Sequence, residues 1–220
     1  AFRAPNAYEN YYHDGYITQK PNLNLKPENI KTYEIIYEHY LQNGFRIVAS
    51  GFYYDIDNLI SATVDKDGLS IFRNIDEAES KGIEFELGKK WDNGFQGRIS
   101  YTFQETKNKE TKRLLENSPK HLAKLNVAIP LIKKYLSAGV EMQYTGNRKT
   151  LLANDAGGYL LGNLTLFSTN IFEGLETSIS IYNIFNKKYS DPGAQEHVQQ
   201  GLDLIQQNGT NFRFKMVYNF

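Results

Sequence analysis

Four tyrosines and one histidine gather in a short polar stretch near the start of the sequence. The stretch contains Tyr8, Tyr11, Tyr12, His13 and Tyr16. Imidazole is a good ligand for iron, and tyrosine rings stack on aromatic or macrocyclic molecules. These residues also occur as ordinary packing residues of loops, so their types leave two interpretations open: a binding surface for a flat ligand, or a packed loop.

The sequence contains none of the common catalytic motifs. It has no Gly-x-Ser-x-Gly element, no phosphate-binding glycine-rich loop and no His-Glu-x-x-His. Glu84 and Glu86 share one face of an expected strand and resemble an acid–base pair, but a hydrated polar surface explains them better. The 4 histidines are scattered and the cysteine count is 0. We therefore expect no catalytic residue, no resident metal and no cofactor, and a protein that is not an enzyme.

Composition excludes two further classes of protein. The 220 residues carry 25 Lys and Arg against 25 Asp and Glu, so no basic excess is available for phosphates, which argues against nucleic acid as a partner. No apolar stretch approaches the ~18 residues of a membrane-spanning helix. The chain nevertheless contains 16 Tyr and 13 Phe, which need a surface that tolerates them.

Alternation with a period of two dominates the sequence and predicts long strands. Phe95, Ile99, Tyr101 and Phe103 fall on one face of their segment, and polar residues such as Arg98 fall on the other. Successive side chains of a strand point to opposite faces, so each segment has an apolar and a polar side. We expect nine such segments, over residues 31–41, 45–57, 80–91, 95–105, 120–129, 135–146, 158–169, 174–185 and 210–220.

Short and long connections alternate along the chain. Residues 42–44 and 92–94 contain Asn-Gly, which suits a tight hairpin turn. Residues 130–134 and 170–173 are also short links, whereas the links over 58–79, 106–119, 147–157 and 186–209 are long. In an up-and-down meander this order puts every short turn at one end, as in outer-membrane barrels.

The last long connection has a weak helical spacing of its own. Val198, Leu202 and Ile205 recur at intervals that suit a helix, and His197 lies beside them. A lid over a pore and a partly ordered surface loop are both consistent with this spacing.

Two architectures fit the alternation. A soluble β-sandwich would turn its apolar face inward, whereas a membrane barrel would turn it toward lipid. Strands longer than the ~5–6 residues of soluble sheets, together with the loop asymmetry and the aromatic richness, favour the barrel. Charged residues on the polar face favour a wet lumen, because a packed interior would have to pair them all. These residues are Glu84, Glu86, Arg98, Lys124, Glu141, Glu176, Arg213 and Lys215.

Aromatic residues near the segment ends fit the girdles that flank a membrane, although aromatic residues are also good strand formers. They are Tyr33, Phe45, Trp91, Phe95, Tyr159, Phe167 and Phe185. Nine strands cannot enclose a wide aqueous pore, and bacterial single-chain barrels have even strand counts, so we expect further strands upstream of this sequence.

Several local strings resemble TonB-dependent outer-membrane receptors, and they occur in the right order along the chain. Residues 1–5 resemble the FRAP box of that family, and residues 22–28 resemble its NPNLKPE stretch with Leu23 in place of the first proline. Residues 80–86 resemble its A-x-S-x-G-x-E-x-E strand. Residues 182–189 resemble its N-L-F-(N/D)-K-x-Y element near the C-terminus.

The resemblance implies an all-β fold, an antiparallel up-and-down transmembrane β-barrel. Residues 1–220 would form its C-terminal portion, about nine or ten strands of a 22-stranded barrel. The plug domain and the N-terminal strands of the family lie outside this sequence, with Ala1 on the external side and Phe220 on the periplasmic side. The final strand is similar to the signal that the outer-membrane assembly machinery reads, through Phe212, Phe214, Met216, Tyr218 and Phe220.

The function implied by the resemblance is energised uptake across the bacterial outer membrane. The cargo would be an iron complex (a siderophore or haem) or a corrinoid, and the partners would be that ligand, outer-membrane lipid, the assembly machinery and the TonB system acting through the plug. The tyrosine stretch would then bind the ligand in an external loop. In haem receptors of the family a histidine between the two boxes ligates haem, so His13 would be an iron ligand only for that cargo.

Two alternatives remain at this point. One is another outer-membrane barrel with a structural, adhesive or enzymatic role, and the other is a soluble β-rich binding domain. A chain that is monomeric in plain buffer would exclude both barrel interpretations.

Overall fold

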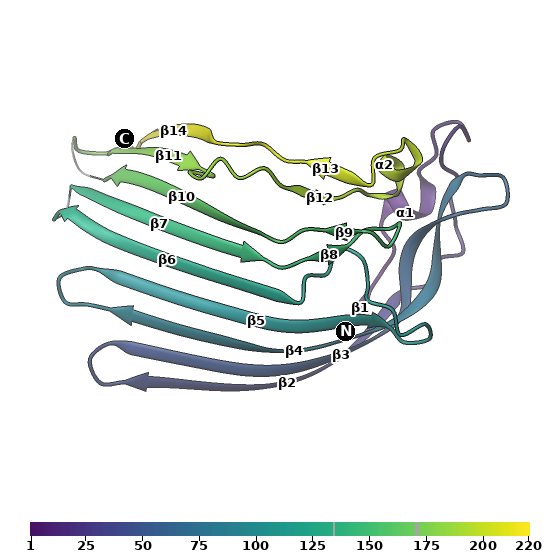
Figure 1. Ribbon diagram of the computed structural model, residues 1–220, viewed down its shortest axis with the longest axis horizontal. Coiled ribbons are helices and arrows are strands. Elements are labelled where there is room, and N and C mark those ends of the chain that lie inside the picture. Colours follow the sequence, from purple (N-terminus) through teal and green to yellow (C-terminus); the bar gives the residue numbers. More distant parts are fainter. Residues whose placement is uncertain (134, 170–171) are drawn as a thin grey trace.

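Ten antiparallel strands form one large sheet within the residues that the computed structural model describes, which are 1–133, 135–169 and 172–220, without the side chains of 75 and 76. The sheet is a meander in which each strand pairs with the next in chain order, apart from two hairpins outside it (Figure 1). Its strands are β1 (Phe2–Arg3), β2 (Glu28–Leu41), β3 (Phe45–Val64), β4 (Ser70–Lys90), β5 (Gln96–Asn108), β6 (His121–Ile132), β7 (Leu136–Thr145), β10 (Tyr159–Ser168), β11 (Leu175–Tyr182) and β14 (Asn211–Tyr218).

The remaining elements gather at one end of the sheet, on the right of Figure 1. They are the helices α1 (Ala7–Tyr11) and α2 (Gln195–Gln199), the hairpin of β8 (Arg148–Lys149) with β9 (Asp155–Ala156), and the hairpin of β12 (Ser190–Pro192) with β13 (Leu204–Gln206). The C-terminus and the short turns lie at the opposite end (Figure 1). No helix within the described residues has the length and the apolar character needed to cross a membrane.

All nine expected segments are strands, and two of the expected turns have the predicted geometry. Asn43 and Gly44 both have positive φ angles, of 73° and 78°, and Gly94 has a φ of 87°. A Cβ on Gly44 would lie 2.5 Å from the carbonyl oxygen of Lys90, so this turn requires glycine. The other two expected turns contain residues 134, 170 and 171, which lie outside the described residues.

The expected long loop over residues 58–79 is wrong. Strand β3 continues to Val64 and β4 begins at Ser70, so a hairpin extends beyond the neighbouring strands. The register shifts between Ile56 and Leu59, where Asn58 has a φ of 57°. This bulge interrupts the alternation, which is why the continuation of the strand does not appear as a regular pattern in the sequence.

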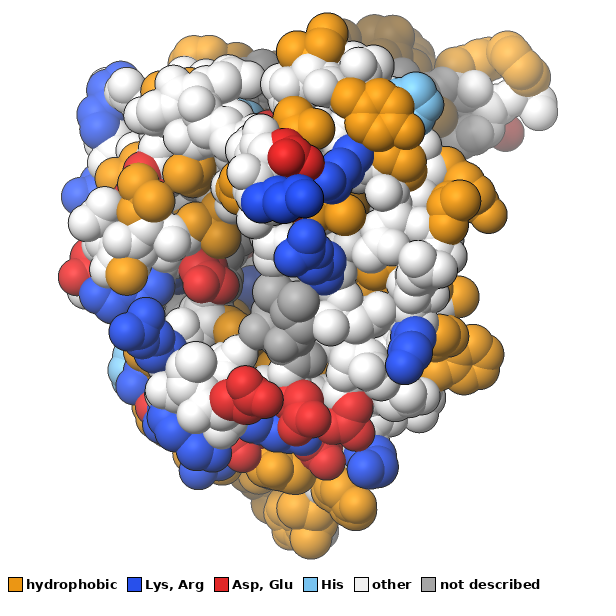
Figure 2. Space-filling model, turned by 90° about the vertical axis from the view of Figure 1, so that its right-hand side faces the viewer, with side chains coloured by type: hydrophobic (Ala, Val, Ile, Leu, Met, Phe, Trp, Pro, Cys, Tyr) orange, Lys and Arg blue, Asp and Glu red, His pale blue; other side chains and the backbone are white. Residues whose placement is uncertain are grey.

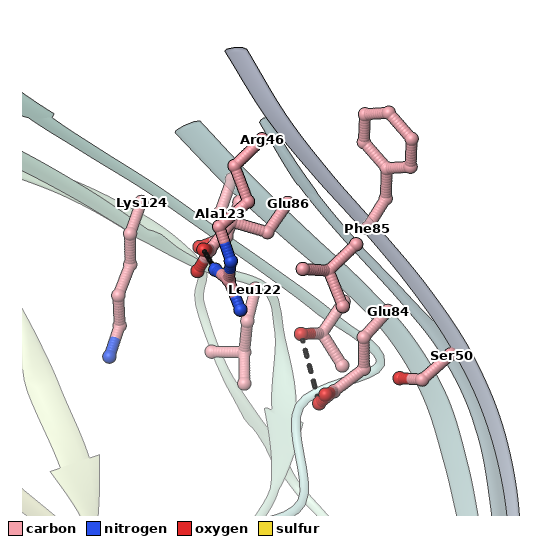
Figure 3. A pocket seen from close by; sticks show the side chains of 11 residues that line it. Arg46, Ser50, Glu84, Phe85, Glu86, Leu122, Ala123 and Lys124 are labelled. Carbon is pink, nitrogen blue, oxygen red and sulfur yellow. Dashed lines mark hydrogen bonds and ion pairs between the residues drawn. The ribbon is translucent and has the colours of Figure 1, made fainter. Parts of the chain in front are cut away.

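The two faces of the sheet differ in the way a membrane barrel requires. Phe103 and Phe214 are 38% and 62% exposed on the apolar face, so the apolar side chains do not converge into a dry centre. Figure 3 shows Arg46, Glu84 and Glu86 turned toward a common hollow while Phe85 points away from it. The buried hydrophobic residues among the described ones are few, namely Ile60, Ile71, Ala78, Ala138 and Ala156. The soluble sandwich is therefore excluded.

Two of the expected girdle residues lie on the wrong face. Phe167 pairs across the sheet with Ser137 and Ser178, on the polar side. Tyr159 also lies on that side, and its hydroxyl donates a hydrogen bond to Asp191 at 3.4 Å. Strand β10 has apolar residues on both faces, so alternation alone does not select the face that meets lipid.

A charge placed on the apolar face should destabilise the barrel more than the same charge on the polar face. Ile99 is 50% exposed on the apolar side of β5, and Ser100 is its neighbour on the polar side. For the protein reconstituted in lipid vesicles, we expect Ile99→Arg to lower the unfolding free energy by about 2–4 kcal/mol and Ser100→Arg by much less. Urea unfolding measures both. Equal losses would contradict the assignment of the faces.

Candidate ligand-binding site

One arginine anchors the tyrosine-rich segment to the sheet. Arg3 of β1 forms a two-pronged ion pair with Glu28 of β2, with its Nε 2.5 Å and its Nη2 2.7 Å from the two carboxylate oxygens. Its Nη1 also lies 2.9 Å from Glu9 of α1. Glu9 and Glu28 are 9% and 4% exposed, and Glu28 accepts a further hydrogen bond from the backbone N–H of Ile60 at 2.8 Å. We call Arg3, Glu9 and Glu28 the charge latch.

The latch also fixes the start of α1. Asn6 accepts a hydrogen bond from the backbone N–H of Glu9 at 2.9 Å, and Glu9 accepts one from the backbone N–H of Asn6 at 2.8 Å. This reciprocal arrangement is a capping box, which satisfies N–H groups that a helix start leaves unpaired. The carboxylate of Glu9 thus holds the short helix in place, because it binds both Arg3 and the backbone N–H of Asn6.

The structure brings Tyr8 and Tyr12 together. Their rings stack with centroids 4.5 Å apart, and Phe72 of β4 meets the Tyr8 ring edge-on at 5.9 Å. The Tyr8 hydroxyl donates to the side-chain oxygen of Gln19 at 3.1 Å. Burial is the main cause that raises the pKa of Tyr8, and the negative charge of Glu196 in α2 adds to it. Glu196 of α2 is therefore near enough to Tyr8 to affect its hydroxyl, and Figure 1 draws both helices at the same end of the sheet.

His13 and Tyr16 form a second ring pair, with centroids 5.2 Å apart. The Nδ1 atom of His13 accepts a hydrogen bond from the backbone N–H of Gly15 at 3.3 Å. Tyr16 has a positive φ of 62°, and Asp14 stabilises this turn by accepting hydrogen bonds from the backbone N–H groups that follow it. Tyr11 is 64% exposed, and none of the ring contacts found within the described residues includes it.

The extended β3–β4 hairpin is the platform for the rest of this segment, and sequence reasoning missed it. Ser70 accepts a hydrogen bond from the backbone N–H of Lys20 at 3.0 Å, and Lys20 forms an ion pair with Asp65 at the hairpin turn. Asn22 donates from its side chain to the carbonyl of Phe72 at 2.8 Å. A signal was present in the turn itself, since Asp65 and Gly68 are typical turn residues.

A second group of polar contacts holds the last long connection. Arg148 is 7% exposed and lies 2.7 Å from Asp191. Asp203 accepts hydrogen bonds from Thr150 at 2.8 Å and from Asn154 at 2.9 Å. The expected helical spacing is wrong beyond Val198, because α2 ends at Gln199 and residue 205 belongs to β13. The connection is anchored to its neighbour by side-chain charges and not by an apolar helix face.

The tyrosine-rich end of the sheet presents rings and polar groups, and the described residues offer no cluster for a metal ion. Within the described residues no group of three or more His, Asp or Glu is placed to hold a metal ion. At the end where the loops gather, hydrophobic, basic and acidic side chains are intermingled on the surface (Figure 2). Such a surface suits a ligand that has both rings and polar groups.

The final strand exposes the side chains expected of an assembly signal. Phe212, Phe214, Met216 and Tyr218 are all more than half exposed, at 72%, 62%, 59% and 57%. One edge of β14 pairs with β11, and within the described residues no strand pairs with its other edge. Its recognition by the assembly machinery, and that of Phe220, stays a prediction.

Comparison with known proteins agrees with this architecture. The model of a protein family described as "TonB dependent receptor-like, beta-barrel" matches residues 1–184. The chain belongs to this family. Proteins of the family lie in the bacterial outer membrane, and so does this chain. The sequence resemblance and the expected all-β barrel portion are thereby confirmed.

The relatives are receptors or transporters. The chain is 26% identical over 167 residues to the ferric-pyoverdine BN7/BN8 receptor of Pseudomonas putida, and it covers 20% of that protein. It superimposes with a TM-score of 0.73 on a mutant ferric enterobactin receptor of Pseudomonas aeruginosa, at 18% identity over 100% of this chain and 37% of the other. The copper transporter OprC gives a TM-score of 0.73 at 17% identity, over 100% and 36%. The chain thus spans about a fifth to a third of these proteins.

Breaking the charge latch should release the tyrosine-rich segment. Arg3→Met leaves Glu9 and Glu28 buried without a cation, which costs about 3 kcal/mol. We expect faster hydrogen exchange over residues 4–27 in the receptor that contains this chain, and an intermediate effect for Arg3→Lys, which keeps the charge but not the fork. Arg73→Met, at an exposed site of β4, is the matched control. Unchanged exchange in Arg3→Met would contradict the latch.

The Asp14 turn should survive mild acid. The Thr18 hydroxyl and the N–H groups of Thr18, Gln19 and Ile17 hold the pKa of Asp14 well below its ordinary value. Because the pKa of Asp14 is lower in the folded than in the unfolded chain, the ionised carboxylate stabilises the turn at every pH above the unfolded pKa of ~3.9. This stabilisation is lost as the pH falls through the lower pKa of the folded state. We expect the Ile17 and Thr18 amides to stay protected from exchange between pH 7 and pH 4, and to lose protection in Asp14→Asn. Loss of protection already near pH 6 would contradict this.

Proposed function

We propose that this chain is the C-terminal barrel portion of a receptor that takes up a ferric siderophore across the outer membrane. The observation that carries the proposal is the exposed tyrosine–histidine surface, held by the charge latch at the end of the barrel where the long connections gather. The ferric-pyoverdine receptor among its relatives supports an iron complex as the cargo.

Binding would depend on many contacts and on no catalytic residue. The Tyr8–Tyr12 and His13–Tyr16 ring pairs stack on the ligand, and neighbouring polar groups orient it. The polar wall of the sheet, which includes Arg46, Glu84 and Glu86 (Figure 3), lines a hydrated passage. The energy for passage comes from the TonB system, through a plug domain outside this chain. No step of this process requires enzyme chemistry.

Haem is a second candidate cargo, because the imidazole of His13 is exposed and stacks on the ring of Tyr16. The Nδ1 atom of His13 is occupied by the N–H of Gly15, which fixes the tautomer with its proton on Nε2 in the resting loop and leaves that atom at the surface. Binding of haem iron through Nε2 would require the ring proton to move to Nδ1 by exchange with solvent, which releases the hydrogen bond from Gly15, while Tyr16 remains stacked beside the imidazole ring. The corrinoid alternative has no comparable feature in its support.

A ligand screen on the receptor that contains this chain distinguishes these cargoes. With a ferric siderophore that the wild type binds, we expect Tyr8→Leu and Tyr12→Leu each to weaken binding several-fold, because each ring contact contributes ~0.5–1.5 kcal/mol. Tyr37→Leu is the matched control, since Tyr37 is 60% exposed on the membrane wall. Fluorescence titration measures all three.

The same titration with haem tests His13. A fall in haem affinity and a changed haem absorption spectrum in His13→Ala, without an effect on siderophore binding, would establish haem as the cargo. Siderophore binding that is equally strong in wild type, Tyr8→Leu and Tyr12→Leu would overturn the proposed binding surface.

A further inference from the structure

The membrane-facing wall contains an apolar groove along β3. It has a volume of 420 Å³. Two small residues, Ala49 and Gly51, form its floor, and Ala49 lies between Tyr37 of β2 and Phe85 of β4. A Cβ on Gly51 would only touch Ile35, at 3.7 Å, so the groove is not needed to avoid a clash. The other lining side chains on this wall are Ile35, Ile83 and Tyr101.

A lysine without an acidic partner lies on the same wall, toward the end with the short turns. Lys89 pairs with Phe45 in the sheet, and its ammonium lies 4.0 Å from the Phe45 ring centroid and 4.9 Å from that of Trp91. Among the described residues, no ion pair includes Lys89. The aromatic rings hold the ammonium in place, and its charge remains available to an anion.

The opposite end of the wall is different. There Lys107 lies 2.5 Å from Glu105, and Lys109 lies 3.0 Å from Asp57. These lysines are already neutralised by carboxylates. An anionic headgroup therefore finds a free cation at the short-turn end, which is the periplasmic end of an outer-membrane barrel.

The spacing between cation and groove suits a lipid. Ala49 lies four residues beyond Phe45 along β3, or ~14 Å of strand at ~3.4 Å per residue, which is ~10 Å of depth for a strand tilted by ~40°. Half of the ~30 Å hydrocarbon core of a bilayer is ~15 Å. A lipid with its phosphate beside Lys89 would therefore extend its acyl chain to the level of the groove.

We propose that this wall binds one phosphoglyceride of the periplasmic leaflet. Lys89 binds the phosphate, Trp91 and Phe45 pack against the glycerol region, and the groove over Ala49 and Gly51 takes one acyl chain. The occupant is a phosphoglyceride because its phosphate matches the ammonium of Lys89, which two aromatic rings hold on this wall, and its leaflet is the one at this end. The site is independent of the transported cargo.

Lipid binding to the delipidated receptor that contains this chain tests the proposal. The probe is phosphatidylglycerol, compared with diacylglycerol of the same chains, and native mass spectrometry measures retention. We expect Lys89→Met to weaken phosphatidylglycerol binding about tenfold and to leave diacylglycerol unchanged. Lys90→Met is the matched control, because Lys90 is the neighbouring residue on the other face. Gly51→Val, which fills the groove without removing the charge, should weaken both lipids.

Three outcomes would overturn the site. Equal losses of phosphatidylglycerol in Lys89→Met and Lys90→Met would mean that any lysine at this end attracts the anionic lipid, without a specific site. Unchanged retention in both Lys89→Met and Gly51→Val would mean boundary lipid without a site. Lipopolysaccharide held in place of phosphatidylglycerol in a Lys89-dependent way would assign the cation to the other leaflet. None of these results bears on siderophore or haem binding, which is measured separately.

Discussion

Hydrocarbon offers no partner for a backbone N–H or C=O group, and the rest of this structure depends on that constraint. Strands can cross a bilayer only where each backbone group pairs with a neighbouring strand. The meander from β2 to β14 provides that pairing along its length. Its side chains then have to satisfy two solvents, so apolar residues such as Ile99 and Phe214 are exposed, at 50% and 62%, where a soluble protein would bury them.

The same constraint sorts the charges of the chain. On the polar face, Arg46 lies 2.6 Å from both Glu38 and Glu86. These ion pairs link the three neighbouring strands β2, β3 and β4 beside a hydrated hollow. On the apolar face, Lys109 and Asp57 form an ion pair toward the end with the long connections. The interactions of a charged residue therefore depend on the face of the sheet where it lies and on its depth in the membrane. The free ammonium of Lys89 stands out because it has rings and no carboxylate beside it.

The fold was largely predictable because two solvents impose a strict period of two. Prediction failed where that period was interrupted or undecided. The bulge at Asn58 concealed the extension of β3, and the two apolar faces of β10 concealed the inward position of Phe167. The capping box of α1 is readable in principle from Asn6 and Glu9, which are three residues apart. The pairing of Arg3 with Glu28, by contrast, joins residues 25 positions apart, and nothing local in the sequence indicates it.

The charge latch separates the attachment of the tyrosine-rich segment from the surface that we propose to bind the ligand. The tyrosine-rich segment joins the sheet through Arg3, Glu9 and Glu28 and through hydrogen bonds to the β3–β4 hairpin, while Tyr11 and Tyr16 remain exposed. Substitution of Tyr11 or Tyr16 would therefore change the proposed binding surface without disturbing a buried side chain, since both are more than half exposed. The copper transporter and the ferric enterobactin receptor share this barrel architecture at 17% and 18% identity to the chain. A fold that tolerates such divergence is expected to fix its external segments by a few buried charges and to leave the exposed rings free to change.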